Sequence, residues 1–438
     1  MQNRIFIVSG AVISTLIYIF LNHWTERHEF GILFGGMCIL FALYFCSALI
    51  PTLRPGRRDV FWLSLIFRGV LIFSIPFLSD DFYRFYLDGT LTLNGTDPFA
   101  FKPNELDFSL IPDGNYLQQE IYPKLNSQEY YSVYPAFLQY VFALGALIGG
   151  TVEGFCLTMK AFLLVNDFFL LAVLYRITST VQIKSQRAAL FMLNPLVIME
   201  TANLHLESMV VLFIALAWLF FMERKNTISG VMTGIAFQIK LLPILILPFL
   251  VKNTSLKNIL WVGLGFVIGT TLLIFPFLST HLWPHFSQSL SLYFKTFEFN
   301  GGLYLLLREI GFLIKGYNTI DIIGSVTPVL FLIVLYAIWS KSSLKNFPTA
   351  LLFVFTAYYF LASIVHPWYL IPVLFFATFT KYRFAWMWSF LIYLSYSSYH
   401  RSGTTEEYWL IASEYLIVWG YLAYELFFQK QTTGTIAS

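Results

Sequence analysis

Apolar runs of about 20 residues recur along almost the whole chain, and they limit what it can fold into. A helix of that length crosses the hydrocarbon core of a bilayer and satisfies its backbone hydrogen bonds internally. Because 58% of the 438 residues are hydrophobic and only 12% are charged, no water-soluble fold could bury the apolar surface. We expect an all-α polytopic membrane protein with about 13–14 transmembrane helices. The apolar runs lie near 4–22, 31–50, 59–78, 155–176, 188–200, 206–222, 228–250, 258–278, 319–340, 347–364, 367–380, 384–399 and 408–428.

Basic residues in short loops indicate the orientation of these helices. Loops that carry Lys and Arg remain in the cytoplasm. Arg4 precedes the first run, and Arg54, Arg57 and Arg58 separate the second run from the third. Both segments therefore belong to the cytoplasmic side, and the third run ends on the outer side at Ser79.

The outer side then receives the polar, motif-rich segments. The longest is 79–154, which we expect to be a folded, partly helical periplasmic or extracytoplasmic loop. No repeat or soluble domain interrupts the chain, so we treat 1–438 as a single membrane domain. The other outer segments are 203–207, 279–302, 366–368 and 399–408.

The sequence gives little support for a nucleic-acid partner, for a cysteine metal site or for a histidine metal site. A net charge of +3 is too small to indicate a nucleic-acid partner. Cys38, Cys46 and Cys156 lie inside apolar stretches without metal-ligand spacing, which is typical of small core residues. His281 and His285 lack an adjacent acid, so they are a weak metal motif.

The most distinctive polar feature is the segment 79–89, SDDFYRFYLDG, where the third run leaves the membrane. Asp80 and Asp81 repel each other, and at the negative end of a preceding helix they would cost stability unless a cation or substrate compensates. If the segment is helical, Asp80, Arg84 and Asp88 share one face. The alternative is a charged helix end at the interface, with a weak Asp80–Arg84 ion pair.

The longer segment SDDFYRFYLDGTLTLNGTDPFAF resembles a motif of the GT-C-fold glycosyltransferases that use polyprenyl-phosphate sugars. The resemblance is to bacterial mannosyltransferases in particular, whose motif is similar to S-D-D-x-Y-R-Y-x-W-D-G-x-x-x-x-G-x-N-P-Y. Leu87 stands where the family often has Trp, and Asp97 where it has Asn. Neither departure touches the carboxylate pair.

Further short motifs of that family follow in family order. They are YPAFLQ at 134–139, NPL at 194–196, a polar turn with Asn203, His205 and Glu207, the segment 234–240 that ends at Lys240, and HPWYL at 366–370. Each string is common alone, but five motifs in family order, all on the outer side of the topology drawn above, are a stronger signal.

The resemblance implies a GT-C-type bundle and an inverting transfer of a single hexose, with mannose favoured. A polyprenyl-phosphate sugar is the implied donor, and a lipid or glycan is the acceptor. Asp80 is the implied base, whereas Asp81 would position the acceptor or bind a divalent cation. No other metal or cofactor is indicated. The family implies a bacterial cytoplasmic (inner) membrane, with the active site facing outward.

The resemblance also implies substrate contacts. A donor phosphate needs cations near the outer interface, and Arg84, Lys240 and His366 are the candidates. Lys240 lies in an apolar run, where an unpaired charge costs ~3 kcal/mol, unless it reaches from a helix end to the interface. Tyr134 and Trp368 could stack on a sugar ring or anchor helices at the interface. The remaining predicted contacts are Asp88, Gln139, His205 and Glu207.

Two other classes of protein stay open at this point. A multi-helix transporter would also carry intramembrane charge, but it would commonly show internal repeats and mid-bilayer carboxylates. A ligase for lipid-linked glycans would be expected to have a larger outer loop late in the chain. The early Asp-Asp loop favours transfer of a monosaccharide.

Overall fold

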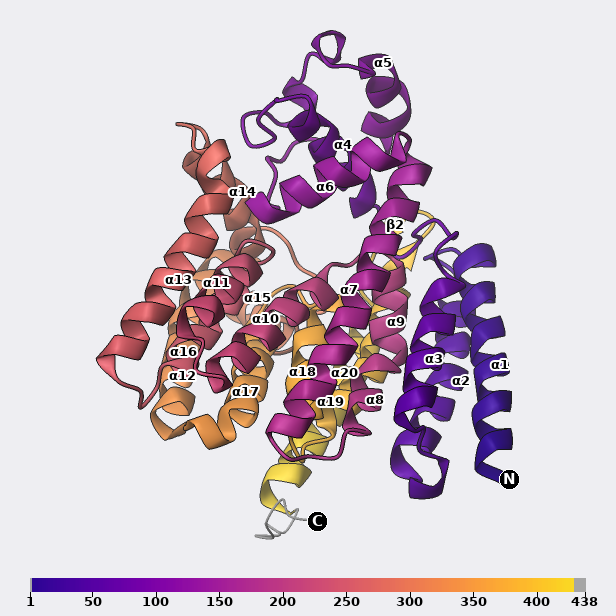
Figure 1. Ribbon diagram of the computed structural model, residues 1–438. Coiled ribbons are helices and arrows are strands. Elements are labelled where there is room, and N and C mark those ends of the chain that lie inside the picture. The colour runs from indigo at the N-terminus through magenta and orange to yellow at the C-terminus, as the bar shows by residue number, and fades with distance from the viewer. Residues whose placement is uncertain (1, 429–438) are drawn as a thin grey trace. The chain divides into compact units, whose positions relative to one another are not determined.

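The computed structural model describes residues 2–428, with side chains from residue 4 onward, and almost all of its regular structure is helical (Figure 1). The expectation of an all-α fold is confirmed. The α-helices are α1 (Gln2–Trp24), α2 (Phe30–Leu49), α3 (Arg57–Gly69), α4 (Asp81–Leu93), α5 (Gly114–Tyr116), α6 (Ala136–Gly149), α7 (Val152–Thr180), α8 (Arg187–Met192), α9 (Pro195–Ala202), α10 (Glu207–Met222), α11 (Asn226–Phe237), α12 (Leu247–Leu250), α13 (Leu256–Ile274), α14 (Leu282–Lys295), α15 (Gly302–Lys315), α16 (Ile320–Lys341), α17 (Phe347–Leu361), α18 (Ile371–Thr378), α19 (Phe384–Leu391) and α20 (Tyr408–Phe427).

Short tight helices and one small hairpin complete the described structure. β1 (Tyr399–His400) pairs antiparallel with β2 (Gly403–Thr404). One turn of π-helix, η4, covers Leu117–Ile121. The 3₁₀ helices are η1 (Pro51–Leu53), η2 (Pro103–Glu105), η3 (Phe108–Leu110), η5 (Tyr122–Lys124), η6 (Leu242–Ile246), η7 (Phe275–Phe277), η8 (Leu344–Asn346), η9 (Pro367–Leu370) and η10 (Ile392–Ser398).

Six segments of the described chain are long and apolar enough to cross a membrane, or seven if the bent pair α9 and α10 forms one broken span. Only 17% of the apolar stretch in Ile320–Lys341 is buried, against 50% in Val152–Thr180. Apolar helices exposed to this degree suit contact with lipid rather than water. The six are Arg4–Trp24, Phe30–Leu49, Val152–Thr180, Leu256–Phe277, Ile320–Lys341 and Tyr408–Phe427.

The number expected from the sequence, about 13–14 crossings, exceeds what this criterion finds within 2–428. The reason is that several apolar runs fold as shorter or interrupted helices. The run 59–78 yields only α3, which ends at Gly69. The run 228–250 divides into α11, η6 and α12 around Lys240 and Pro243, as its polar and proline residues indicate.

The chain forms two compact units. Unit 1 comprises 1–71, 167–200 and 294–438, and unit 2 comprises 72–166 and 201–293. The prediction of a single membrane domain over 1–438 stays a prediction.

In unit 1, a buried ion pair and a capped helix tie together segments that are distant in the sequence. Arg68 of α3 donates to Asp167 of α7 at 2.5 Å and also to the Met192 carbonyl. The NPL motif starts α9, where Asn194 accepts the Leu196 N–H at 2.9 Å and donates to Ser389 of α19. This motif is therefore explained by helix capping and packing.

In unit 2, the segment 79–154 is partly helical, as the sequence predicts. α4 and α6 lie beside each other, and short helices fill the chain between them (Figure 1). A side chain at Gly89 of α4 would place its Cβ 2.4 Å from the Phe142 carbonyl oxygen of α6. Gly95 follows α4 with φ +74°, a conformation that favours glycine. The two motif glycines are thus required by packing and by a turn.

Candidate active site

Asp80 and Asp81 lie at the start of α4 and are both half-buried. The sequence-based expectation placed them at the negative end of a preceding helix, and this is wrong. α3 ends at Gly69, and the chain from 70 to 80 is not helical. Pro76 lacks an N–H and disfavours a helical residue before it, so it opposes a helix that would continue to Asp80. At a helix N-terminus the dipole stabilises carboxylates, so the mutual repulsion of the pair and its partial burial remain as costs.

Asp81 is oriented by a residue that the sequence analysis missed. The Asn126 side-chain amide donates to Asp81 Oδ1 at 2.8 Å, and the Asp81 backbone N–H donates to Ser79 Oγ at 3.2 Å. Asn126 itself is exposed, between the buried Leu125 and the half-buried Ser127. No short-range pattern in the sequence relates it to Asp81.

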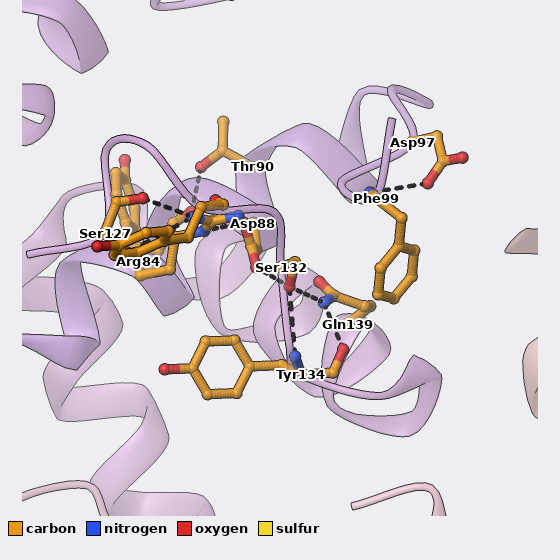
Figure 2. Close-up of polar contacts among 11 residues, drawn as sticks. Arg84, Asp88, Thr90, Asp97, Phe99, Ser127, Ser132, Tyr134 and Gln139 are labelled. Carbon is orange, nitrogen blue, oxygen red and sulfur yellow. Dashed lines mark hydrogen bonds and ion pairs between the residues drawn. The ribbon is translucent and has the colours of Figure 1, made fainter. Parts of the chain in front are cut away.

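Arg84 and Asp88 form a buried ion pair one turn further along α4 (Figure 2). Arg84 Nε donates to Asp88 Oδ1 at 2.7 Å, and the two side chains are 3% and 0% exposed. Ser132 Oγ donates to the other oxygen, Asp88 Oδ2, at 2.6 Å. Arg84 Nη1 reaches the carbonyls of Ser127 at 3.2 Å and Tyr130 at 2.8 Å. This pair therefore fastens the loop to α4.

Gln139 and Tyr134, from the predicted YPAFLQ motif, join the same network (Figure 2). Gln139 is fully buried, and its amide donates to Ser132 Oγ at 3.1 Å and to the Tyr134 carbonyl at 2.9 Å. The Tyr134 ring meets Phe85 of α4 edge-on at 4.8 Å. Asp88, Tyr134 and Gln139 are thus brought together, and their contacts shape the entry to α6.

The negative charges of the carboxylate pair act on three tyrosine hydroxyls. Burial, together with the negative charge of Asp80, raises the pKa of Tyr83. Burial and then the charge of Asp81 raise the pKa values of Tyr134 and of Tyr293 in α14. These hydroxyls stay protonated at neutral pH and can donate hydrogen bonds. The sequence analysis did not single out Tyr293.

Glu207 and Lys240 form an ion pair, and their side chains are 7% and 30% exposed. The sequence suggested each separately, and the pairing explains how Lys240 is tolerated in an apolar run.

His205 is buried in the turn before α10. In the same turn, Asn203 Oδ1 accepts the backbone N–H groups of Phe77 at 2.7 Å and Leu78 at 3.1 Å. The turn therefore holds the segment that leads into Asp80.

Two further buried polar residues support this region and were missed from the sequence. Lys160 of α7 donates to Ser74 Oγ at 2.8 Å and to the Ser74 carbonyl. Gln238 accepts the Ala136 N–H at 3.2 Å, at the start of α6. Lys160 could have been noticed as a single charge in the apolar run 155–176.

The predicted His366 and Trp368 lie in unit 1 and contact each other. Their rings stack at 4.3 Å with an interplanar angle of 7°, and His366 also stacks on Phe299 at 4.6 Å. The segment around Phe299 pairs with the chain before His366, because the Val365 N–H donates to the Phe299 carbonyl at 2.8 Å. Both rings therefore belong to an ordered aromatic cluster.

The contacts of Asp97 show how an aspartate can replace the asparagine of the family motif. Its side chain accepts the Phe99 N–H at 2.9 Å and the Ser279 hydroxyl at 3.1 Å. An Asn oxygen can accept the same local hydrogen bond, so the turn is preserved.

Possible metal ligands are sparse in the described residues. Within 2–428, no three His, Cys, Asp or Glu side chains gather closely enough to hold a metal ion. His285 Nδ1 lies 2.9 Å from the Phe99 carbonyl oxygen, and its ring stacks on Tyr131 at 3.7 Å. This histidine therefore has a packing role in unit 2.

Together, the fold and the site define a multi-pass membrane protein with a carboxylate pair held at a helix start by a folded loop. The family model described as alpha-(1->6)-mannopyranosyltransferase, N-terminal domain, matches residues 7–255. The chain belongs to this mannosyltransferase family, which confirms the predicted resemblance to mannosyltransferases. It is a membrane glycosyltransferase that requires a sugar donor and an acceptor. No curated protein and no solved structure matches the chain.

The matched residues include all the predicted site residues of unit 2. They exclude His366 and Trp368, which lie beyond residue 255. The family match therefore bears on the Asp80–Asp81 region.

Proposed function

We propose that the chain transfers a single mannose from a polyprenyl-phosphate donor to a lipid or glycan acceptor with inversion. The proposed enzyme has a GT-C-type fold and works on the outer face of a bacterial cytoplasmic membrane. The observation that carries the proposal is the carboxylate pair at the start of α4, within the stretch that matches a mannosyltransferase family. The outward orientation rests on the distribution of basic loops.

The proposed reaction is a direct displacement at the anomeric carbon. An acceptor hydroxyl attacks, its proton passes to a carboxylate, and the bond to the lipid phosphate breaks, so that the phosphate leaves with the bonding electron pair. Asp80 is our choice for the base. It lies half-buried at a helix start, and burial together with the charge of Asp80 raises the pKa of Tyr83.

Asp81 would position the acceptor or hold a divalent cation. Its Oδ1 is engaged by Asn126, so Oδ2 is the oxygen directed to a substrate or cation in this proposal. The two adjacent carboxylates supply oxygen ligands of the kind that Mg²⁺ and Ca²⁺ prefer, and such a cation would help to neutralise a donor phosphate. The proton transfer described above does not depend on it.

The donor phosphate would be bound by cations of the site. Lys240 is the best candidate, because its side chain is partly exposed while Glu207 holds it in place. Arg84 Nε binds Asp88 and its Nη1 binds two loop carbonyls, so we assign Arg84 to supporting the loop. A phosphate contact from His366 and sugar contacts from His205, Tyr134 and Trp368 remain predictions.

The donor class is tested with purified protein in lipid vesicles that contain acceptor lipids from a bacterial membrane extract. Radiolabelled polyprenyl-phosphate mannose and a nucleotide-linked mannose are offered separately. Transfer of label from the lipid donor alone, with β-linked donor giving α-linked product, supports the proposal. Transfer from the nucleotide sugar alone would refute it. Movement of a whole lipid-linked glycan would favour a ligase, and solute uptake without transfer would favour a transporter.

A further inference from the structure

The buried Arg84–Asp88 pair takes no part in the proposed chemistry, yet Arg84 lies only one helical turn from Asp81 and Asp88 only two. Its guanidinium points to the backbone of the loop, where Nη1 donates to the carbonyls of Ser127 and Tyr130 (Figure 2). Ser132 fastens the same loop to Asp88 at 2.6 Å. The segment 127–132 is therefore fixed to α4 at several points.

Asn126 directly precedes this fixed segment and follows Leu125, which is 6% exposed. An exposed amide would ordinarily move freely in water and orient nothing. Here the buried Leu125 side chain anchors one side, and the contacts of Arg84 anchor the other. The amide of Asn126 is thus held where it donates to Asp81 Oδ1 at 2.8 Å.

We propose that Asn126 is a positioning residue that sets the orientation of the Asp81 carboxylate, and that the Arg84–Asp88 pair acts on the site through it. The inference rests on the proposed function, because it assigns a task to one carboxylate of the same site. By occupying Oδ1, Asn126 turns Oδ2 towards the acceptor. The segment 125–132 thereby sets the orientation of a carboxylate on α4.

The chain offers matched variants for this proposal. Asn126→Ala removes the donor, whereas Asn126→Asp keeps the shape and places an acceptor against Asp81. Ser127→Ala is the control, because Arg84 binds the Ser127 backbone carbonyl, and the hydroxyl lies 3.5 Å away. Since Asn126 is exposed, we expect all three variants to fold with wild-type thermal stability.

The test measures kcat and the donor KM in reconstituted vesicles with polyprenyl-phosphate mannose. We expect kcat to fall ~10- to 100-fold in Asn126→Ala and further in Asn126→Asp, because a small misplacement of a reacting group has effects of this size. The donor KM and the Ser127→Ala variant should stay at wild-type values. A purely structural role would not separate kcat from KM in this way.

Amide hydrogen exchange of the segment 122–133 is a second measurement, and it does not depend on activity. Exchange should rise at least ~10-fold in Asp88→Asn, where the contacts that fasten the loop are weakened, and stay unchanged in Asn126→Ala. Wild-type kcat in both Asn126 variants, while the wild type transfers mannose, would overturn this inference alone. Absence of transfer by the wild type would overturn the proposed function and this inference with it.

Discussion

Two fully buried carboxylates, one in each unit, are stabilised in different ways. Asp88 of α4 accepts from the Arg84 guanidinium and from the Ser132 hydroxyl. Glu414 of α20 is equally buried, but its Oε1 accepts from neutral groups, the Trp388 indole at 2.8 Å and the Asn300 amide at 3.4 Å. Its Oε2 has no hydrogen-bond partner among the described residues.

The difference indicates what each acid does. Asp88 and its partner Arg84 bind several residues of the segment 127–132, so they fix the loop that lies next to Asp81. The partners of Glu414 come from α19 and from Asn300, two residues before α15, so this acid joins segments of unit 1. Removing the charged partner Arg84 should therefore be costly in unit 2, whereas replacing Glu414 by glutamine should cost little.

The largest effect is expected for Arg84→Met, which leaves Asp88 as a buried charge without its cation. We expect a loss of ~3–5 kcal/mol of stability, the usual cost of breaking one partner of a buried ion pair. Thermal unfolding in detergent measures it. Arg84→Lys is the matched control and should recover part of the loss, since a lysine keeps the charge but not the forked geometry. Wild-type stability of Arg84→Met would contradict the importance given to this pair.

The second effect concerns the close approach of α4 and α6. Gly89→Ala would place a methyl group 2.4 Å from the Phe142 carbonyl oxygen, so the two helices would have to separate. We expect a loss of ~1–3 kcal/mol, typical of overpacking, and a fall in transfer. Gly35→Ala in α2 is the control, because no atom lies within 4 Å of its added Cβ. Equal melting temperatures for the two variants would argue against tight α4–α6 packing.

The third prediction separates two roles of Lys240. Lys240→Met leaves Glu207 largely buried without its partner, which should cost ~1–2 kcal/mol. Combining it with Glu207→Gln should restore most of that stability, because both charges are then removed. If Lys240 also binds the donor phosphate, the double variant should keep a raised donor KM. A donor KM that returns to the wild-type value would assign Lys240 a structural role alone.

The smallest effect is expected for Glu414→Gln. The amide oxygen can still accept from Trp388 and Asn300, and no described cation loses its partner. We expect a change below ~1 kcal/mol, measured by the same unfolding assay. Asp88→Asn is the direct comparison and should be several times more destabilising. If Glu414→Gln were the more harmful change, the contrast between the two regions would be reversed.

The sequence predicted the helical membrane architecture, because apolar length is a local signal. It singled out 79–89 by its adjacent carboxylates, and the role of that segment stays a prediction. It also pointed to Glu207 and Lys240, but separately, because their pairing depends on tertiary structure. It placed the carboxylates at the wrong kind of helix end, since the apolar run continues past the point where α3 stops.

The contact of Asn126 with Asp81 could not be predicted from local sequence patterns. This contact spans 45 residues and depends on how Arg84 folds the loop back. The number of crossings was also hard to predict, because an apolar run does not reveal whether it forms one long helix or several short ones.

The most direct test of the account is the rate of mannose transfer from polyprenyl-phosphate mannose by Asp80→Asn and Asp81→Asn in vesicles. The account predicts a fall of ~10²–10⁴-fold in kcat for Asp80→Asn, the usual contribution of a general base, with thermal stability unchanged. A comparable loss in Asp81→Asn alone would move the base by one residue. Wild-type rates in both variants would contradict the claim that this carboxylate pair carries the reaction.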